Sequence, residues 1–334
     1  MHLSTSNSRV PTRRDIIVLL AVCIVFCASL EAVTAFLFGR ISHIEKRRET
    51  EYGAAIGIRS AKDRHGASAL VAGNSLLLEG VNFSQLQRDI GPGIELHRAV
   101  IENTFYLDWY YGLRRMFKMG SQPDIVVLVL NPTQLASRAT DGDYAAHFLV
   151  DRRDLTGLAK SIGADRNRMS SLALANLSFF YGTRAEIRTW VLGNILPDLP
   201  GLVHLFHFAR ATPGSETLRQ VATERLFQLH ELCEQHGVAL VVVIPPAKED
   251  SGASAVLEAA ATSGVKVLVP IEPGTLLASD YSDNFHLNSY GAAKFTPALA
   301  DRLKQFLSET ATEQRQTASL PWAVGTRFNT QSGR

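Results

Sequence analysis

The sequence is poor in cysteine and has almost no net charge. Only three cysteines occur in 334 residues, and two of them, Cys23 and Cys27, lie in an apolar N-terminal segment. Cys233 is alone in the body of the chain, which excludes an intradomain disulfide and a cysteine-based zinc site there. The net charge of +2 favours neither a nucleic acid nor a strongly acidic partner. The sequence contains no cluster of basic residues with interleaved aromatic residues, the pattern that indicates RNA binding.

The sequence also lacks the glycine-rich loops of nucleotide-binding proteins. No Gly-x-Gly-x-x-Gly motif follows the first predicted strand, and no phosphate-cradling loop is visible, which disfavours an ordinary Rossmann or flavodoxin-like binding domain. His204 and His207 lie three apart on a predicted helix, but no carboxylate accompanies them in the same turn, so we predict no metal site. We expect no cofactor.

One long hydrophobic run is present, residues 16–38, after a basic tail of residues 1–15. A helix of about 20 residues crosses a bilayer. The alternative is a cleaved signal peptide, whose apolar region would be only about 7–15 residues long. Because the run continues through Phe38, we predict an uncleaved transmembrane anchor. Glu31 inside it either contacts a partner within the membrane or lies close enough to one edge to reach water.

The orientation of this anchor rests on a weak charge signal. Basic residues flank the run on both sides, so the positive-inside count is nearly balanced. The short basic tail favours an N-terminus in the cytoplasm. We therefore expect a single-pass inner (plasma) membrane protein with its body on the periplasmic or extracytoplasmic side.

The rest of the chain alternates apolar strands with helices. Residues 39–65 are charged and predict a helical stalk, residues 66–308 an α/β domain, and residues 309–334 a disordered tail. Predicted strands cover residues 68–72, 95–101, 124–130, 238–244 and 265–269, and predicted helices cover 81–90, 105–119, 216–235, 253–263 and 289–307. Largely apolar strands alternating with helices indicate a parallel sheet covered on both faces. Thr296-Pro297 suggests that the last helix restarts there.

Residues 136–214 break this alternation and predict a helical insertion after the third strand. Its predicted helices cover residues 169–181, 187–195 and 202–209. The aromatic residues of the insertion could line an acyl or sugar site or face the membrane, although a place in the core is the plainer interpretation. They are Phe179, Phe180, Tyr181, Trp190, Phe206 and Phe208.

The stretch Leu70–Gly80, LVAGNSLLLEG, ends a buried strand in a tight turn that carries a serine. Gly73 allows the turn without a Cβ clash. Ligands and chemistry gather at the carboxyl ends of strands in an open α/β sheet, so Ser75 is a candidate nucleophile. Most Gly-x-Ser turns are only turns, and the assignment therefore depends on a group that activates the hydroxyl.

A second polar block precedes the last predicted helix and contains Asp283 and His286. A serine hydroxyl needs a base to take its proton, and the base needs an acid that fixes its tautomer. Asp283 and His286, three residues apart, could supply both groups at the end of the first strand. The alternative is a capped helix start with a surface histidine.

Three polar blocks together resemble the SGNH (GDSL-like) hydrolase superfamily. They are Gly73-Asn74-Ser75, Asn131 after the third strand, and Asp283-Asn284-Phe285-His286-Leu287-Asn288 followed by Gly291. The match is closest to membrane-anchored relatives linked to O-acylation of cell-envelope or exported polysaccharides, and it covers about residues 66–308. It implies a flavodoxin-like three-layer sandwich.

The resemblance also implies roles for the polar residues. Ser75 would be the nucleophile, His286 the base and Asp283 its support, while the Asn131 amide and the Ser75 backbone N–H would bind the oxyanion. The chain departs from the family pattern twice. Asn74 replaces the usual aspartate before the serine, and Ile101-Glu102-Asn103-Thr104 lacks the usual glycine, so Asn103 would have to replace that donor.

These expectations leave two hypotheses of different class. The first is an anchored serine esterase or O-acyltransferase that acts on acyl, and specifically acetyl, esters of a glycan. The second is a non-catalytic SGNH-like scaffold or glycan-binding subunit of an envelope assembly. Both imply contact with the membrane through residues 16–38, a membrane-protein partner fits both, and neither involves a nucleic acid.

Overall fold

A computed structural model describes residues 12–61, 66–195, 213–250 and 252–318. The chain divides into two compact units. The first unit comprises Met1–Thr50, Tyr110–Arg115 and Arg138–Ala209, and the second comprises Glu51–Trp109, Met116–Ser137 and Arg210–Arg334. The predicted helix at 202–209, with His204, His207, Phe206 and Phe208, lies outside the described residues.

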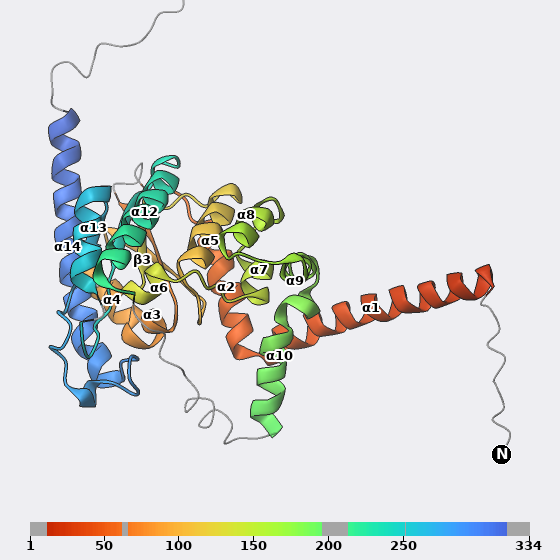
Figure 1. Ribbon diagram of the computed structural model, residues 1–334. Helices are drawn as coiled ribbons and strands as arrows, with labels where there is room; N and C mark the ends of the chain where they lie inside the picture. Colours follow the sequence, from red (N-terminus) through yellow and green to blue (C-terminus); the bar gives the residue numbers. More distant parts are fainter. Residues whose placement is uncertain (1–11, 62–65, 196–212, 251, 319–334) are drawn as a thin grey trace, which may run out of the picture. The chain divides into compact units, whose positions relative to one another are not determined.

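The second unit, which contains the helices α3, α4, α12, α13 and α14 labelled in Figure 1, is built on a five-stranded parallel sheet. Its strand order is β2-β1-β3-β4-β5. Its strands are β1 (Ala67–Gly73), β2 (Ile94–Val100), β3 (Ile125–Val129), β4 (Ala239–Val243) and β5 (Lys266–Leu268). This is the flavodoxin-like order. The predicted α/β class with a parallel sheet is therefore confirmed, and each predicted strand lies within two residues of its observed position.

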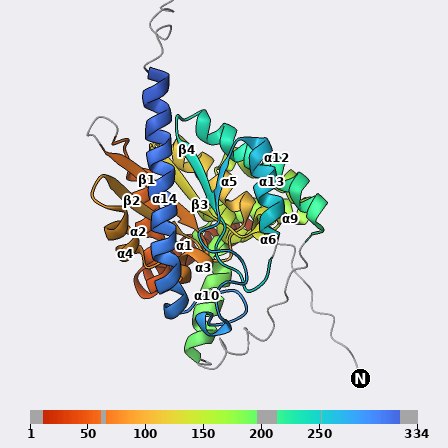
Figure 2. The same ribbon diagram turned by 90° about the vertical axis from the view of Figure 1, so that its left-hand side faces the viewer.

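Helices cover both faces of this sheet. The bounds are α3 (Ser75–Gly80), α4 (Phe83–Ile90), α6 (Pro132–Ala136), α12 (Ser215–Glu234), α13 (Ala253–Ser263) and α14 (Ser289–Ala318). α14 lies over the strands on one face (Figure 2). Residues paired across the strands, Val71, Val127 and Val241, belong to the buried cluster on the α14 side. Because side chains alternate along a strand, the intervening residues face the opposite layer.

α14 differs from its prediction in two ways. The helix does not restart at Thr296-Pro297 but continues without a break, and it extends past Leu307 to Ala318. Pro297 has no N–H to donate within the helix. The preceding residue, Thr296, ties this part of the helix to the start of α4, since its buried hydroxyl donates to the Ala292 carbonyl at 2.8 Å and accepts from the Asn82 N–H at 3.0 Å.

A buried aspartate ties the start of the sheet together. The Asp124 carboxylate, directly before β3, accepts hydrogen bonds from the Ser68 N–H at 2.8 Å and the Ala61 N–H at 2.9 Å. The Ser60 hydroxyl donates to its other oxygen. Burial alone would raise the pKa of Asp124, but these hydrogen bonds hold it below its ordinary value.

The segment expected as a stalk forms helix α2 (His43–Gly57), which begins in the first unit and ends in the second. Its later turns do not stand free, because Tyr52 and Ala55 are buried. The Glu51 carboxylate accepts from the Val100 N–H at 2.9 Å and from Arg98. The spacing of the apolar residues at the end of α2 is the sequence signal for this packing.

The first unit contains the predicted helical insertion. Its helices are α1 (Arg13–Ile41), the central part of α5 (Tyr106–Lys118), α7 (Asp143–Phe148), the 3₁₀ turn η2 (Arg152–Asp154), α8 (Leu155–Ser161), α9 (Arg166–Leu177) and α10 (Phe179–Ile195). The sequence predicted one helix over 169–181, but the structure breaks it at Ser178. α1 is long and apolar enough to cross a membrane, and its apolar stretch is not buried.

Candidate functional site

Ser75 lies at the carboxyl end of β1, where the chain turns into α3. Gly73 is buried, and a Cβ there would lie 2.9 Å from the Val129 carbonyl oxygen and 3.1 Å from the Leu77 Cβ. Only glycine therefore allows β1 and β3 to approach the turn this closely. Ser75 is the first residue of α3, so its N–H has no partner within the helix.

Ser75, His286 and Asp283 form one hydrogen-bonded chain, although 211 residues separate the serine from the histidine. The Ser75 Oγ lies 2.9 Å from His286 Nε2. On the other side of the ring, His286 Nδ1 lies 2.7 Å from Asp283 Oδ2. A carboxylate can only accept, so Nδ1 carries the proton that it donates to Asp283, and the neutral ring leaves Nε2 as the acceptor for the serine hydroxyl.

The loop that carries Asp283 and His286 is held by its own backbone. The Ser282 N–H donates to the His286 carbonyl at 2.9 Å, and Tyr281 and Leu287 form an isolated antiparallel bridge. Asp283 Oδ1 accepts from the His286 N–H at 2.7 Å and from the Phe285 N–H at 2.8 Å. The aspartate thus orients the histidine through its backbone as well as its ring.

The first two turns of α14 contact this loop at Asp280. Asp280 is buried, and its carboxylate accepts from Lys294 at 2.7 Å and from the Leu277 N–H at 2.9 Å. A Cβ on Gly291 would lie 2.3 Å from the Asp280 carbonyl oxygen. Gly291 is required because helix and loop touch at this point.

The environment of Asp283 favours its charged form. Partial burial alone would raise the pKa of this carboxyl, but the N–H groups of His286 and Phe285 and the imidazole hold the pKa below its ordinary value. The His286 side chain is 11% exposed and the Asp283 side chain 28% exposed. The carboxylate is therefore ionised near neutral pH, as support for an imidazolium requires.

Asn131 lies at the carboxyl end of β3, beside the Ser75 turn in the sheet, because Val129 pairs with Gly73. It forms a capping box with Gln134: its Oδ1 accepts from the Gln134 N–H at 2.7 Å, and its own N–H donates to the Gln134 side chain at 3.0 Å. The Nδ2 amide has no hydrogen-bond partner within the described part of the chain.

Asn103 follows β2, whose Val100 pairs with Gly73 on the other side of β1. Its φ is +59°, and among the described residues no other non-glycine residue has a positive φ. Asparagine tolerates this left-handed region better than most residues. Asn103 thus adopts a backbone conformation that favours glycine, at the position where the resembling family has one. No hydrogen bond joins Asn103 or Asn131 to Ser75, His286 or Asp283 among the residues described.

Sequence reasoning missed a buried network behind the nucleophile turn. Asn74 is fully buried; its Oδ1 accepts from the Leu76 N–H at 3.1 Å, and its Nδ2 donates to the Thr104 carbonyl at 2.9 Å. The Thr104 hydroxyl donates to the Ile101 carbonyl at 2.6 Å and accepts from the Trp109 indole at 2.9 Å. Asn74 therefore links the turn of Ser75 to the turn of Asn103. The only sign of this link in the sequence was an asparagine at a position where the SGNH proteins that the chain resembles usually have aspartate.

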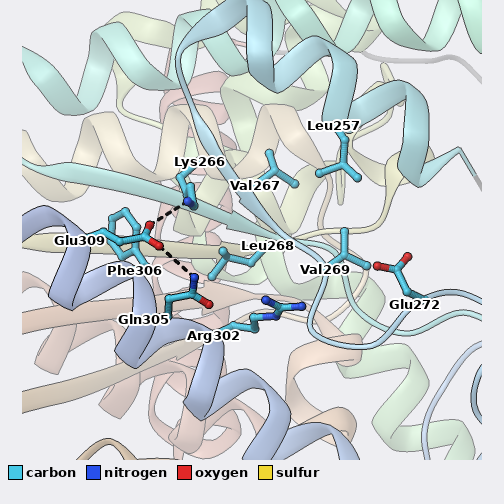
Figure 3. A pocket seen from close by; sticks show the side chains of 10 residues that line it. All are labelled: Leu257, Lys266, Val267, Leu268, Val269, Glu272, Arg302, Gln305, Phe306 and Glu309. Carbon is cyan, nitrogen blue, oxygen red and sulfur yellow. Dashed lines mark hydrogen bonds and ion pairs between the residues drawn. The ribbon is translucent and has the colours of Figure 1, made fainter.

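A hollow of about 240 Å³ lies elsewhere in the second unit, beside the edge strand β5 (Figure 3). Lys266 and Gln305 both contact the Glu309 carboxylate in it, each at 2.9 Å. β3 and β4 separate β5 from β1, so this hollow is not part of the Ser75 site. Within the described residues no group of three His, Cys, Asp or Glu side chains could hold a metal ion.

Comparison with known proteins yields little for this chain. No protein-family model matches it, and no curated protein matches it either. Among solved structures, one similar chain is a crystal structure described as an alpha/beta hydrolase enzyme from the metagenome of Lake Arreo, Spain. It is 12% identical, with a TM-score of 0.37, and the match covers 70% of this chain and 93% of the other.

Proposed function

We propose that the second unit is a serine acyl-ester enzyme in which Ser75 is the nucleophile, His286 the general base and Asp283 its support. The observation that carries the proposal is the unbroken hydrogen-bond chain from the Ser75 Oγ through both ring nitrogens of His286 to the Asp283 carboxylate. Nucleophile, base and orienting acid within hydrogen-bond reach are the arrangement that acyl transfer through a serine needs.

In the proposed reaction the Ser75 Oγ attacks the carbonyl carbon of an acyl ester while its proton passes to His286 Nε2. The imidazolium that forms is stabilised by the Asp283 carboxylate. The tetrahedral intermediate then expels the alcohol, which takes the proton back from His286 and leaves an acyl group on Ser75. Water or a second hydroxyl attacks this acyl group, again giving its proton to His286, and Ser75 is restored.

The oxyanion of the intermediate needs hydrogen-bond donors. The Ser75 N–H and the Asn131 Nδ2 amide are without partners among the described residues and lie on adjacent strand ends, which supports this role for both. The Asn103 N–H is a third candidate, because the left-handed backbone there matches a position that glycine otherwise occupies. One such donor is typically worth about 10²–10³ in rate.

The proposed substrates are acyl, and specifically acetyl, esters of an envelope or exported glycan. This substrate class rests on the resemblance of the three polar blocks to membrane-anchored polysaccharide O-acylation proteins. The Phe285 ring, 40% exposed and 4.2 Å from the His286 ring centre, offers a sugar or acyl group an apolar contact beside the base. Whether the product is the free acid or a new ester depends on whether water or a sugar hydroxyl reaches the acyl-enzyme.

The test uses the full chain in detergent micelles with p-nitrophenyl acetate as substrate. We expect Ser75→Ala and His286→Ala to abolish turnover, and a serine-directed fluorophosphonate to label the wild type but not Ser75→Ala. Ser84→Ala, on the exposed surface of α4, is the matched control and should retain full activity. Equal turnover in the Ser75→Ala variant and the wild-type protein would reject the mechanism.

The alternative function is a non-catalytic scaffold or glycan-binding subunit. The observation that favours it is the use of Asn74 as a structural link instead of the aspartate of the family pattern. Labelling of Ser75 by the fluorophosphonate would exclude this alternative, because the probe reacts only with an activated hydroxyl.

We also propose that α1 anchors the protein in the plasma membrane, with the body on the extracytoplasmic side and a membrane protein as partner. The length and exposure of the apolar stretch of α1 support the anchor. Orientation can be tested with Phe227→Cys, an exposed position on α12. We expect a membrane-impermeant thiol reagent to label this cysteine in cells whose plasma membrane is intact; labelling only after lysis would reverse the orientation.

A further inference from the structure

Two helices of the first unit carry exposed apolar side chains. On α9, Leu174 is 51% exposed and Leu177 60% exposed. On α10, Trp190 and Val191 are each 37% exposed and Ile195 is 67% exposed. Val191 and Ile195 are four residues apart and lie on one face of the helix, and Trp190 lies next to this face, about 100° around the helix from Val191. The interpretation of Trp190 as a core residue is therefore wrong.

The carboxylate of Glu31 on the apolar helix α1 binds the turn between these two helices. Glu31 Oε2 accepts from the Ser178 hydroxyl at 2.8 Å and from the Phe180 N–H at 3.2 Å, and its other oxygen accepts from the Phe179 N–H. Ser178 is the turn between α9 and α10, so Glu31 caps the first turn of α10. Glu31 therefore contacts a helix of its own chain, and the place of this contact relative to the membrane stays a prediction.

The packing of α1 changes at this point. From Arg13 to Ser29 its residues are exposed on all sides, whereas Glu31, Thr34 and Phe38 are partly or fully buried along one side. Figure 1 shows α10 crossing α1 near the C-terminal end of α1. Among the described residues, α1 is thus exposed for most of its apolar length and packs against another helix only in its last turns.

The position of Glu31 along α1 sets the depth of the α9–α10 turn. Glu31 precedes Phe38, the end of the apolar run, by about two helical turns, or about 10 Å of helix. Helices that lie in the membrane interface bury their apolar face about 5–10 Å below the surface. A carboxylate at that depth is costly unless it is paired, and Glu31 receives three donors there.

We propose that the α9–α10 turn and the apolar face of α10 insert into the lipid leaflet on the side of the body. The lipid-facing residues would be Leu174, Leu177, Trp190, Val191 and Ile195. The inference rests on the proposed anchoring by α1, with which this surface is continuous through Glu31. Tryptophan is typical of the level where headgroups meet acyl chains, and Arg188, which is exposed one helical turn before Val191, suits anionic headgroups.

The insertion would make α10 a second attachment. A single membrane-spanning helix lets the body rotate about the helix axis. The α9–α10 turn, held against α1 and inserted in the leaflet, would restrict this rotation. The Ser75 site is not involved, so the proposal can fail while the proposed enzymatic activity stands.

The experiment places a fluorescent label at single cysteines of the full chain. Cys23 and Cys27 are replaced by alanine, and Cys233 is retained because it is buried. Leu177→Cys and Val191→Cys are labelled with the nitrobenzoxadiazole group and reconstituted in vesicles of phosphatidylethanolamine and phosphatidylglycerol. Ile24→Cys reports on the anchor. Leu277→Cys, in the second unit, is the matched control, since Leu277 is 66% exposed and Leu177 60%.

Lipids with a nitroxide on the acyl chain should quench the labels at 177, 191 and 24 by at least about half, while iodide in the buffer quenches only the label at 277. Iodide quenching at 177 and 191 as strong as at 277, with the label at 24 still quenched by lipid, would overturn the insertion and leave the anchor. Labels at 177 and 191 that neither quencher reaches would indicate a protein partner and would also overturn it. If the label at 24 escapes lipid quenching, the anchor fails and the insertion with it.

Discussion

Asn74 offers the sharpest test of how this site is built. Substituting Asn74→Asp would restore the residue that the resembling family has before its serine. In this chain the exchange keeps the oxygen that accepts from the Leu76 N–H but replaces the amide that donates to the Thr104 carbonyl. Two oxygens would then face each other in a site where Asn74 is 0% exposed.

The cost follows from these contacts. A buried carbonyl left without its donor costs about 1–3 kcal/mol, and a buried carboxylate without a cation adds to this, so we expect a loss of about 2–4 kcal/mol at pH 8. The carboxyl can avoid the loss by binding a proton and donating it to Thr104. The pKa of the new aspartate is then higher in the folded than in the unfolded chain, so the variant loses stability as the pH rises.

The assay is urea unfolding of the full chain in micelles, at pH 5 and at pH 8. Asn74→Ala is the control. It loses the cap and the donor but adds no charge, so its loss of unfolding free energy relative to the wild type should be the same at pH 5 and at pH 8. We expect Asn74→Asp to be closer to the wild type at pH 5 than at pH 8. Turnover should fall about tenfold or more, because the turns of Ser75 and Asn103 lose their link. A variant as stable as the wild type at pH 8 would refute the reasoning.

Four further predictions follow from other contacts. Asp124→Asn should lower the free energy of unfolding by about 2–4 kcal/mol, against less than about 0.5 kcal/mol for the exposed Asp301→Asn; since the pKa of Asp124 is lowered in the fold, wild-type stability should fall as the pH drops through it. Gly291→Ala should reduce turnover by about 10²-fold by displacing the Asp280 loop, while Gly53→Ala, with open space around it, should not; equal turnover would contradict the tight contact. Asn103→Gly should keep its activity and Asn103→Val should lose it, as judged by p-nitrophenyl acetate turnover, because valine does not tolerate a positive φ; an active valine variant would contradict this. Burial raises the pKa of Glu45 from 4.5 to about 7, so the folded chain holds this proton more tightly than the unfolded one and should lose stability between about pH 5 and pH 8; thermal unfolding of Glu45→Gln should lack this component, and an unchanged pH dependence would contradict it.

The polar blocks illustrate how far the sequence reaches into the site. Asp283 and His286 lie three residues apart, so a contact between them could be expected from local geometry alone. The contact of His286 with Ser75 spans 211 residues; the sequence suggested it through the expected place of both residues at the edge of the sheet and through the resemblance, and only the tertiary structure brought the two side chains together. The sequence could not identify the partners of two other hydrogen bonds, that of Asn74 to the Thr104 carbonyl and those of Glu31 to the Phe179 and Phe180 N–H groups, because these partners are backbone groups that every residue carries.

The sequence by itself determined the alternation of strands and helices, the parallel sheet, the apolar N-terminal segment and the helical insertion. These features depend on the spacing of apolar residues, which can be read along the chain. Only the tertiary structure decided that α14 continues through Pro297, that Glu51 of α2 binds Val100 and Arg98 of β2, and that Asn103 adopts a left-handed backbone. Each of these depends on neighbours distant in sequence, whose packing and hydrogen bonds outweigh the local preferences of the residues concerned.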